Sequence, residues 1–268
     1  MNTPKPVVLC ILDGWGLSET TVANAPALAN TPTFDAMMAK CPNATLITHG
    51  PDVGLPTGQM GNSEVGHTNI GAGRVVAMDL GQIDLAIEDE SFFDNRALKA
   101  FIATLLETGG TAHLMGVISD GGVHGHIEHI LAALKAMSDA GVPAVLHAIT
   151  DGRDVAPKSA FTYLETLAER MPHGTKIATV TGRYFAMDRD TRWERVAEAY
   201  NAMVHGTGVA AADAHAAVSN AYARSESDEF ISASVIGGYS GATDKDGFFC
   251  LNFRADRARE ILAALGQP

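Results

Sequence analysis

Near its start the chain carries a block of hydrophobic positions that ends at an acidic residue. Residues 7–12 are all apolar and partly β-branched, and Asp13 follows them directly. A short continuous apolar run of this kind is typical of a strand buried on both faces in a parallel sheet. Residues 44–48 predict a second strand, and proline at position 32 predicts a helix that runs to about residue 40. Asp13 is therefore expected at the carboxyl end of a strand, where open α/β sheets bind their ligands.

From about residue 78 the pattern changes to alternating strands and helices. Each apolar run is short, and an amphipathic segment of helical length separates it from the next. Such alternation predicts an α/β fold with a parallel or mostly parallel sheet. The expected strands are residues 111–119, 143–149, 176–180 and 248–253, and the expected helices are 127–140, a segment from about 157, a segment ending near 204 and a terminal helix opened by Arg254 and Arg257.

The loops after these four strands are rich in arginine, histidine and aspartate. The carboxyl ends of parallel strands meet at one edge of a sheet, so these side chains are expected to lie together. An arginine fork matches a phosphate or carboxylate with two hydrogen bonds, and several forks predict a pocket for a polyanion. Asp154 follows Arg153 and has two open roles, as acceptor of a substrate hydroxyl or as partner of the arginine. The seven loop residues are His124, Arg153, Asp154, Arg183, Arg189, Arg254 and Arg257.

A serine in a glycine-rich stretch is the candidate nucleophile. Ser63 lies between Gly61 and Gly66 and precedes a helical pattern, so it is expected to cap that helix. The free N–H groups of a helix start favour an incoming phosphate. The ordinary alternative for Ser63 is a capped helix without catalytic function. The ordinary alternative for Asp13 is a turn residue before Gly14. Together with the arginine-bearing loops, Ser63 and Asp13 predict a phosphate-handling site.

Composition narrows the class of protein. The 268 residues are 46% hydrophobic and carry a net charge of −12, which allows one large or two ordinary domains and argues against a broad nucleic-acid-binding face. No apolar run has the length of a membrane span. Cys10, Cys41 and Cys250 are odd in number and far apart. They are expected to be reduced, buried thiols of a cytoplasmic protein.

Three other motifs carry less weight. Residues 70–74 lack the third glycine of a dinucleotide-binding fingerprint, and residues 58–63 lack the lysine of a P-loop. The histidines at 124, 126 and 129 are an alternative metal site, but few carboxylates accompany them. Histidines at a helix start are more often solvent-facing.

Six motifs resemble, in order, those of the cofactor-independent phosphoglycerate mutases. They are VVLCILDGWG, LPTGQMGNSEVGHTNIGAGR, ISDGGVHGH, DGRDVAP, TGRYFAMDRD and NFRADRARE, and they span residues 7–260. The resemblance implies a member of the alkaline-phosphatase superfamily that interconverts 3-phosphoglycerate and 2-phosphoglycerate in glycolysis. It implies a phosphoserine intermediate and two divalent metal ions, manganese in many members. Phe185 stands where the family pattern has tyrosine, a minor departure.

The resemblance also implies roles for individual residues and domains. Ser63 would be nucleophile and metal ligand, Asp13 a ligand of the same metal, and the seven loop residues would line the substrate pocket. Residues 1–77 would begin a three-layer phosphatase-like domain, which is incomplete here. Residues 78–268 would form an inserted α/β transferase-like domain that binds substrate.

Length is the main departure from the family. Its members are considerably longer, and their C-terminal half supplies the remaining Asp and His metal ligands and a substrate lysine. The chain is therefore expected to be the N-terminal half of an enzyme that is monomeric when complete. Two alternatives remain. One is a phosphatase or phosphopentomutase of the same superfamily, which would share Asp13 and Ser63 but would not require the loops with His124, with Arg153 and Asp154, and with Arg183 and Arg189. The other is a non-catalytic phosphoglycerate-binding fragment.

Overall fold

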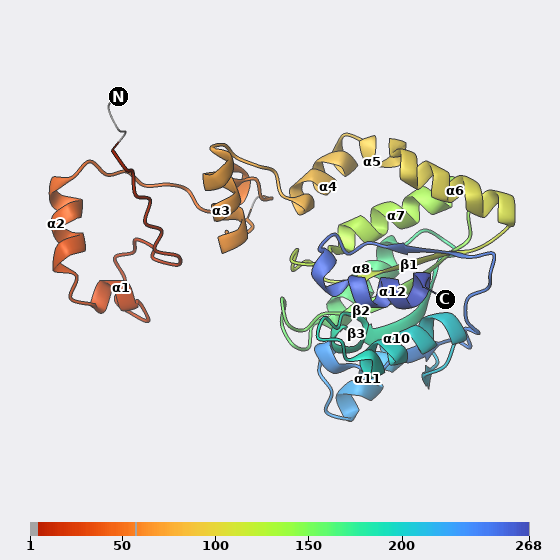
Figure 1. Ribbon diagram of the computed structural model, residues 1–268. Coiled ribbons are helices and arrows are strands. Elements are labelled where there is room, and N and C mark those ends of the chain that lie inside the picture. Colours follow the sequence, from red (N-terminus) through yellow and green to blue (C-terminus); the bar gives the residue numbers. More distant parts are fainter. Residues whose placement is uncertain (1–4, 57, 268) are drawn as a thin grey trace. The chain divides into compact units, whose positions relative to one another are not determined.

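The computed structural model describes residues 5–56 and 58–267, and the chain divides into two compact units (Figure 1). Unit 1 is Met1–Met78 and unit 2 is Asp79–Pro268. The outer limits of the two expected domains, Met1 and Pro268, lie outside the described residues. The assignment of these units to a phosphatase-like domain and an inserted domain stays a prediction.

Unit 2 contains a six-stranded sheet, which confirms the α/β class. The strands run in the order β4-β5-β3-β2-β1-β6, and every neighbouring pair is parallel except β3 with β5. The three central strands coincide with predicted ones, while the last is shorter than expected and β4 and β5 were not foreseen. The strands are β1 (Ala112–Val117), β2 (Ala144–Thr150), β3 (Lys176–Gly182), β4 (Val209–Ala211), β5 (Ser234–Ile236) and β6 (Gly247–Cys250).

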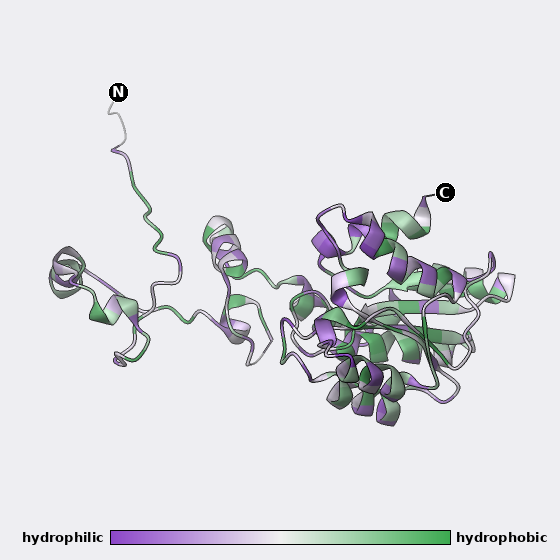
Figure 2. Ribbon diagram, turned by 90° about the horizontal axis from the view of Figure 1, so that it is seen from below, coloured by the Kyte–Doolittle hydropathy of each residue, from purple (hydrophilic) through white to green (hydrophobic). Residues whose placement is uncertain are grey.

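Helices cover both faces of this sheet, because the central strands are apolar on both sides. All six residues of β1 are buried, and neighbouring positions face different cores. Leu114 belongs to a core that includes residues of α7, α8 and α11, whereas Met115 belongs to a core that includes residues of α10 and α12. The strands are accordingly among the most hydrophobic parts of unit 2 (Figure 2). The helices are α4 (Asp79–Glu88), α5 (Ser91–Asp94), α6 (Arg96–Thr108), α7 (Ile127–Asp139), α8 (Ala160–Arg170), α9 (Arg183–Ala186), α10 (Trp193–His205), α11 (Ala214–Ala223) and α12 (Arg259–Gly266).

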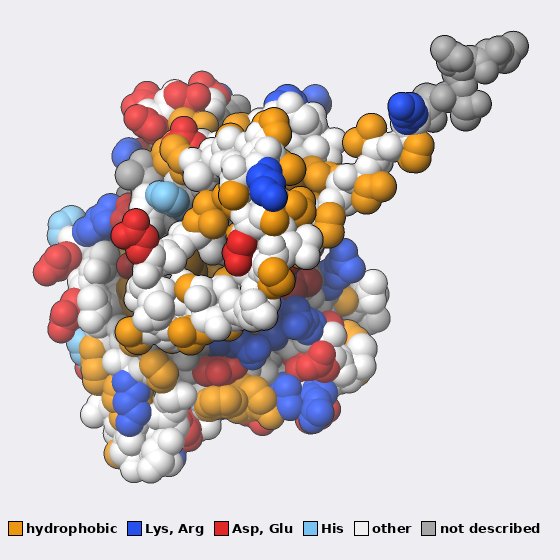
Figure 3. Space-filling model, turned by 90° about the vertical axis from the view of Figure 1, so that its left-hand side faces the viewer, with side chains coloured by type: hydrophobic (Ala, Val, Ile, Leu, Met, Phe, Trp, Pro, Cys, Tyr) orange, Lys and Arg blue, Asp and Glu red, His pale blue; other side chains and the backbone are white. Residues whose placement is uncertain are grey.

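The described residues of unit 1 form helices and turns but no strand. Its elements are α1 (Ala25–Leu28), α2 (Pro32–Lys40), the 3₁₀ turn η1 (Gly50–Val53) and α3 (Ser63–Ala72). The prediction of a helix from proline 32 is confirmed, but the strands predicted at 7–12 and 44–48 are wrong. A buried strand needs neighbouring strands for its backbone hydrogen bonds, and these segments have none in unit 1. Val7 is 95% exposed and Leu46 86% exposed, and apolar side chains remain visible along the N-terminal stretch (Figure 3).

The cysteines also differ from expectation. Cys10 and Cys41 are exposed and Cys250 is partly buried, so the prediction of three buried thiols is wrong for the first two, which lie in unit 1. All three thiols are free. Within residues 5–56 and 58–267, no helix combines the length and the apolar character that crossing a membrane requires.

A chain of hydrogen-bonding side chains crosses the core of unit 2. His147 of β2 is fully buried, with Nδ1 2.9 Å from Thr179 Oγ1 and Nε2 2.9 Å from His113 Nδ1. The His113 and His147 rings stack at a centroid distance of 5.2 Å. Burial, and then the neighbouring His113, lower the pKa of His147 from 6.5 to about 3. The imidazole is therefore neutral in the folded protein.

We expect this histidine to make the protein acid-sensitive. Between its unfolded pKa of 6.5 and its folded pKa of about 3, the unfolded chain binds a proton that the folded chain does not. The free energy of unfolding is therefore highest above that window. It decreases as the pH is lowered through the window, by about 1.4 kcal/mol per pH unit for one such group. We expect the free energy of unfolding to decrease from pH 7 to pH 5, as measured by denaturant titration. This decrease should be about 2 kcal/mol smaller in His147→Gln than in the wild type. Exposed His173→Gln is the control, and equal losses in all three proteins would contradict the assignment.

Candidate active site

Ser63 and Asp13 meet at the start of α3 in unit 1. The Ser63 hydroxyl donates to Asp13 Oδ2 at 2.9 Å, although fifty residues separate the two. Ser63 is the first helical residue and not the cap: Asn62 caps the helix, and its Oδ1 accepts from the Val65 N–H. The predicted cap was therefore one residue too late. Gly61 is required because a Cβ there would lie 1.7 Å from the Thr48 carbonyl oxygen.

A histidine one helical turn on also reaches Ser63. His67 Nδ1 lies 2.8 Å from the Ser63 carbonyl oxygen and 3.1 Å from the Ser63 hydroxyl oxygen. A single Nδ1–H that donates to the carbonyl leaves no lone pair at that nitrogen for the hydroxyl proton. Asp13 is then the acceptor of the hydroxyl proton. His67 was not a candidate from sequence, although its i+4 spacing from Ser63 was a usable signal.

The Asp13–Ser63 pair has the chemistry of a partial metal site. A carboxylate and a hydroxyl are oxygen donors of the kind that hard divalent cations prefer, but such ions take about six ligands. In the described part of the chain, no group of three or more His, Cys, Asp or Glu residues is arranged to hold a metal. The pair therefore fits two positions of a coordination shell and leaves the others to be supplied.

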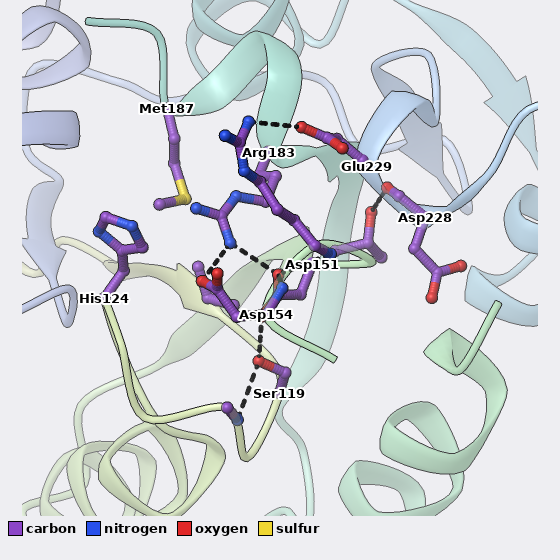
Figure 4. Close-up of polar contacts among 12 residues, drawn as sticks. Ser119, His124, Asp151, Asp154, Arg183, Met187, Asp228 and Glu229 are labelled. Carbon is purple, nitrogen blue, oxygen red and sulfur yellow. Dashed lines mark hydrogen bonds and ion pairs between the residues drawn. The ribbon is translucent and has the colours of Figure 1, made fainter. Parts of the chain in front are cut away.

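In unit 2 the charged loops meet around one buried arginine, Arg183 (Figure 4). Arg183 follows β3 directly, and its side chain is only 2% exposed. Its Nη1 donates to Asp151 Oδ1 at 2.7 Å and to Asp154 Oδ2 at 2.5 Å. Burial opposes the charge, but the two carboxylates outweigh it and raise the pKa of Arg183. Asp154 thus pairs with Arg183 and not with its neighbour in sequence.

Asp151 joins the ends of three adjacent strands. Its Oδ2 accepts from the Ser119 hydroxyl after β1 at 2.5 Å, and its Oδ1 accepts from Arg183 after β3. The backbone N–H groups of Arg153 and Asp154 donate to the same Oδ1 at 3.2 and 3.0 Å, which folds the loop around the carboxylate. Asp151 was not among the candidates, although it opens the DGRD motif immediately after a strand.

A second carboxylate, Asp256, gathers three more of the loop residues. Arg189 Nη1 donates to its Oδ2 at 2.9 Å. Its Oδ1 lies 3.3 Å from Arg254 Nε and 3.6 Å from His124 Nδ1. These contacts bring together the loops after β3, β6 and β1. Asp256 was not among the candidates either, because nothing in the neighbouring sequence distinguishes it from a solvent-exposed aspartate.

The remaining two arginines complete the cluster. Arg257 Nη1 donates to the Met187 carbonyl at 3.0 Å. Burial first, and then the charges of nearby Arg189, Arg183 and Arg153, lower the pKa of Arg257. Arg153 is the most open of the group, 55% exposed and 3.4 Å from Glu229 Oε1. The structure thus brings the seven loop residues into one neighbourhood, and their role in binding stays a prediction.

Two local expectations about this region differ from the structure: the start of the terminal helix, and the solvent-facing position of the histidines near residue 127, since His124 and His129 are buried. Arg254 and Arg257 do not open the terminal helix: a 3₁₀ turn, η3 (Ala255–Arg257), precedes α12. His126 is the cap of α7, with Nδ1 accepting from the Glu128 N–H at 3.2 Å. His129 Nε2 lies 2.9 Å from Asp84 Oδ1. His124 stands apart from both and belongs to the arginine cluster.

A hollow of about 630 Å³ lies elsewhere in unit 2, near the amino ends of β2 and β3. Lys176, His215 and Tyr239 contribute to its lining, which is mostly apolar and includes none of the seven loop residues. A polyanion needs converging cations, and these lie at the carboxyl ends of the strands. The charged edge is therefore the better candidate site.

The buried pair yields a stability prediction. Asp151→Ala removes one of two carboxylates from a guanidinium that has almost no access to water, so we expect a loss on the order of 3 kcal/mol in unfolding free energy. Asp139→Ala removes an exposed carboxylate that pairs with Lys135 and should cost less than about 1 kcal/mol. Denaturant titration of both variants gives the comparison. Equal costs would show that Asp151 does not hold the cluster together.

Three comparisons place the chain among known proteins. Residues 83–268 match the family model described as BPG-independent PGAM N-terminus. A 2,3-bisphosphoglycerate-independent phosphoglycerate mutase of Ruegeria sp. (strain TM1040) is 74% identical across 100% of this chain and 53% of its own length. The corresponding Ruegeria pomeroyi protein is 72% identical over the same shares. The chain spans about half the length of the curated relatives it matches.

A solved structure agrees with these relatives. The Leishmania mexicana phosphoglycerate mutase at low cobalt concentration superimposes with a TM-score of 0.76 at 32% identity. The match covers 90% of this chain and 47% of that one.

Proposed function

The chain belongs to the family of BPG-independent phosphoglycerate mutases, and we propose that it supplies the N-terminal half of an enzyme that interconverts 3-phosphoglycerate and 2-phosphoglycerate. In this proposal the loops of unit 2 bind the substrate and Ser63 of unit 1 accepts the phosphoryl group. The complete enzyme would be a monomer that acts in glycolysis.

The crowding of arginines in unit 2 carries the proposal. Arg257 lies close enough to three other arginines that their charges, with burial, lower its pKa. Like charges packed together in a partly buried place destabilise one another unless an anion joins them. Phosphoglycerate carries a phosphate and a carboxylate, which suit several guanidinium forks at once. A phosphatase or phosphopentomutase of the same superfamily would not require this set of loop residues.

Ser63 and Asp13 support the phosphoryl-transfer half of the proposal. A serine hydroxyl is a weak nucleophile at its ordinary pKa and needs an activating neighbour. Asp13 accepts a hydrogen bond from the Ser63 hydroxyl and so fixes the direction of that hydroxyl, with the oxygen lone pairs turned away from the carboxylate. Bound divalent metal ions, which we propose to be two manganese ions, would stabilise the serine oxygen as an alkoxide and neutralise the transferring phosphate.

The proposed function of unit 2 is to retain the glycerate. Asp154 lies beside Arg183 and can accept a hydroxyl hydrogen bond from the glycerate through its second carboxylate oxygen. The arginines hold the anionic ends of the substrate. Free thiols throughout the chain suit a reducing, cytoplasmic compartment.

The proposed partner is the remaining half of the enzyme. Asp13 and Ser63 leave most positions of a metal shell open, so further ligands must come from other polypeptide. The exposed apolar side chains of unit 1, such as Val7 at 95% and Val22 at 82%, would also be covered by such a partner. A non-catalytic phosphoglycerate-binding fragment is the second candidate, favoured by the same shortage of ligands.

Activity measurements separate these two. We expect residues 1–268 with manganese to convert no 3-phosphoglycerate, because two oxygen ligands cannot hold the ions in place. Addition of the C-terminal half of the Ruegeria sp. (strain TM1040) relative should restore conversion. The matched control is Ser63→Ala, which should remain at least about 10³-fold less active in the mixture, as loss of a nucleophile does.

Two outcomes would contradict the proposal. Conversion by residues 1–268 alone, lost in Ser63→Ala, would mean that the chain builds its own metal site. No conversion by the mixture, under conditions where the full-length relative is active, would favour the binding fragment.

A further inference from the structure

The two carboxylate oxygens of Asp256 have different surroundings. Oδ2 accepts from Arg189 at 2.9 Å. Oδ1 is buried and has no hydrogen-bond partner, although Arg254 Nε lies 3.3 Å and His124 Nδ1 3.6 Å away. His124 Nδ1 is also buried and also lacks a hydrogen bond. Two buried polar atoms of complementary kind thus face each other just beyond hydrogen-bond distance, an arrangement that costs free energy unless another state pairs them.

We propose that Asp256 is a positioning residue for the phosphoglycerate reaction. When the anion binds, Arg189 and Arg254 leave Asp256 and pair with the anion, and Asp256 instead accepts a hydrogen bond from the Nδ1–H of His124. His124 then meets the anion as an imidazolium through Nε2–H. This inference rests on the proposed function, since it needs phosphoglycerate as the anion. Asp256 itself touches no substrate and acts through its three partners.

The geometry makes the exchange a small movement. Asp256 lies in the short turn η3, and the Arg254 N–H donates to the His124 carbonyl at 3.4 Å, so backbone contact joins the two loops. Gly125 packs so closely on Asn252 that a Cβ would lie 2.6 Å from its Oδ1. To form a hydrogen bond of about 2.9 Å, Asp256 Oδ1 and His124 Nδ1 would have to approach from their present separation of 3.6 Å.

The charges favour the exchange only when an anion is present. Burial opposes ionisation of Asp256, but the Arg189 hydrogen bond and the charge of Arg254 prevail and lower its pKa. Without ligand this carboxylate is the counter-charge for both arginines. A bound phosphate and carboxylate replace Asp256 as the counter-charge of the two arginines, and Asp256 is then free to pair with His124.

His124 changes its protonation for the same reason. Burial, and then the charge of Arg183, lower the pKa of His124 to about 4 in the unliganded protein. Arg254 acts in the same direction, while Asp154 and Asp256 oppose it. A polyanion that neutralises Arg254 removes one opposing charge and adds an attractive one. The imidazole then binds a proton as the ligand binds.

The test is the ¹⁵N spectrum of the His124 ring in the full 268-residue chain, followed by pH titration with and without 3-phosphoglycerate. His124→Asn identifies the signals. We expect a neutral ring above about pH 5 without ligand, and protonation of both nitrogens with ligand at a midpoint raised by at least about one pH unit. In Asp256→Asn the bound midpoint should fall by about one unit or more, whereas Asp256→Glu should keep it raised.

Asp190→Asn is the matched control, because it removes an exposed carboxylate of the loop that carries Arg189 and should leave the titration unchanged. A wild-type midpoint that does not move on binding overturns the inference, whether or not any variant folds. So does a bound midpoint that is the same in Asp256→Asn and the wild type. Saturating 3-phosphoglycerate that perturbs no ring or guanidinium signal in unit 2 overturns the proposed function instead.

Discussion

A buried guanidinium must keep its counter-charge, and the charged edge of unit 2 is built around that requirement. Arg183 is 2% exposed and lies between Asp151 and Asp154. Asp151 also accepts from Ser119, so the ends of β1, β2 and β3 are tied by one carboxylate. Removal of either sign of charge would leave the other buried without a partner, which is far more costly than loss of a surface pair. The loops that carry Arg189 and Arg254 are joined by a different carboxylate, Asp256.

The parallel sheet explains why these groups meet. β1, β2 and β3 are parallel neighbours whose carboxyl ends pair, Val117 with Ile149 and Thr150 with Gly182, so the residues that follow them emerge at one edge. β6 lies beside β1 and adds the turn with Arg254, Asp256 and Arg257. Unit 1 offers different chemistry, a serine whose hydroxyl is oriented by Asp13. In the proposed reaction, unit 2 would retain the glycerate and unit 1 would accept the phosphoryl group.

Features that depend on local sequence pattern were predictable, whereas features that depend on contacts between residues distant in sequence were not. β1 to β3 were predictable because each is a long apolar run flanked by polar loops, whereas three-residue strands such as Val209–Ala211 carry no such signal. The apolar run at 7–12 looked like a strand, but a strand also needs a hydrogen-bonding neighbour, and the described residues of unit 1 provide none. The arginines were found from their positions after strands. Their counter-ions Asp151 and Asp256 were not, since a counter-ion is defined by a partner distant in sequence.

The crystal structure of the chain with 3-phosphoglycerate tests the central claim, that the charged edge of unit 2 is the substrate site. The account predicts ligand density at the carboxyl ends of the strands, with phosphate or carboxylate oxygens about 2.7–3.0 Å from guanidinium nitrogens of Arg254 and Arg257. Arg183 should keep its contact with Asp151 in that complex. Density in the 630 Å³ hollow beside Lys176 and His215, with the arginine edge unchanged, would contradict the account.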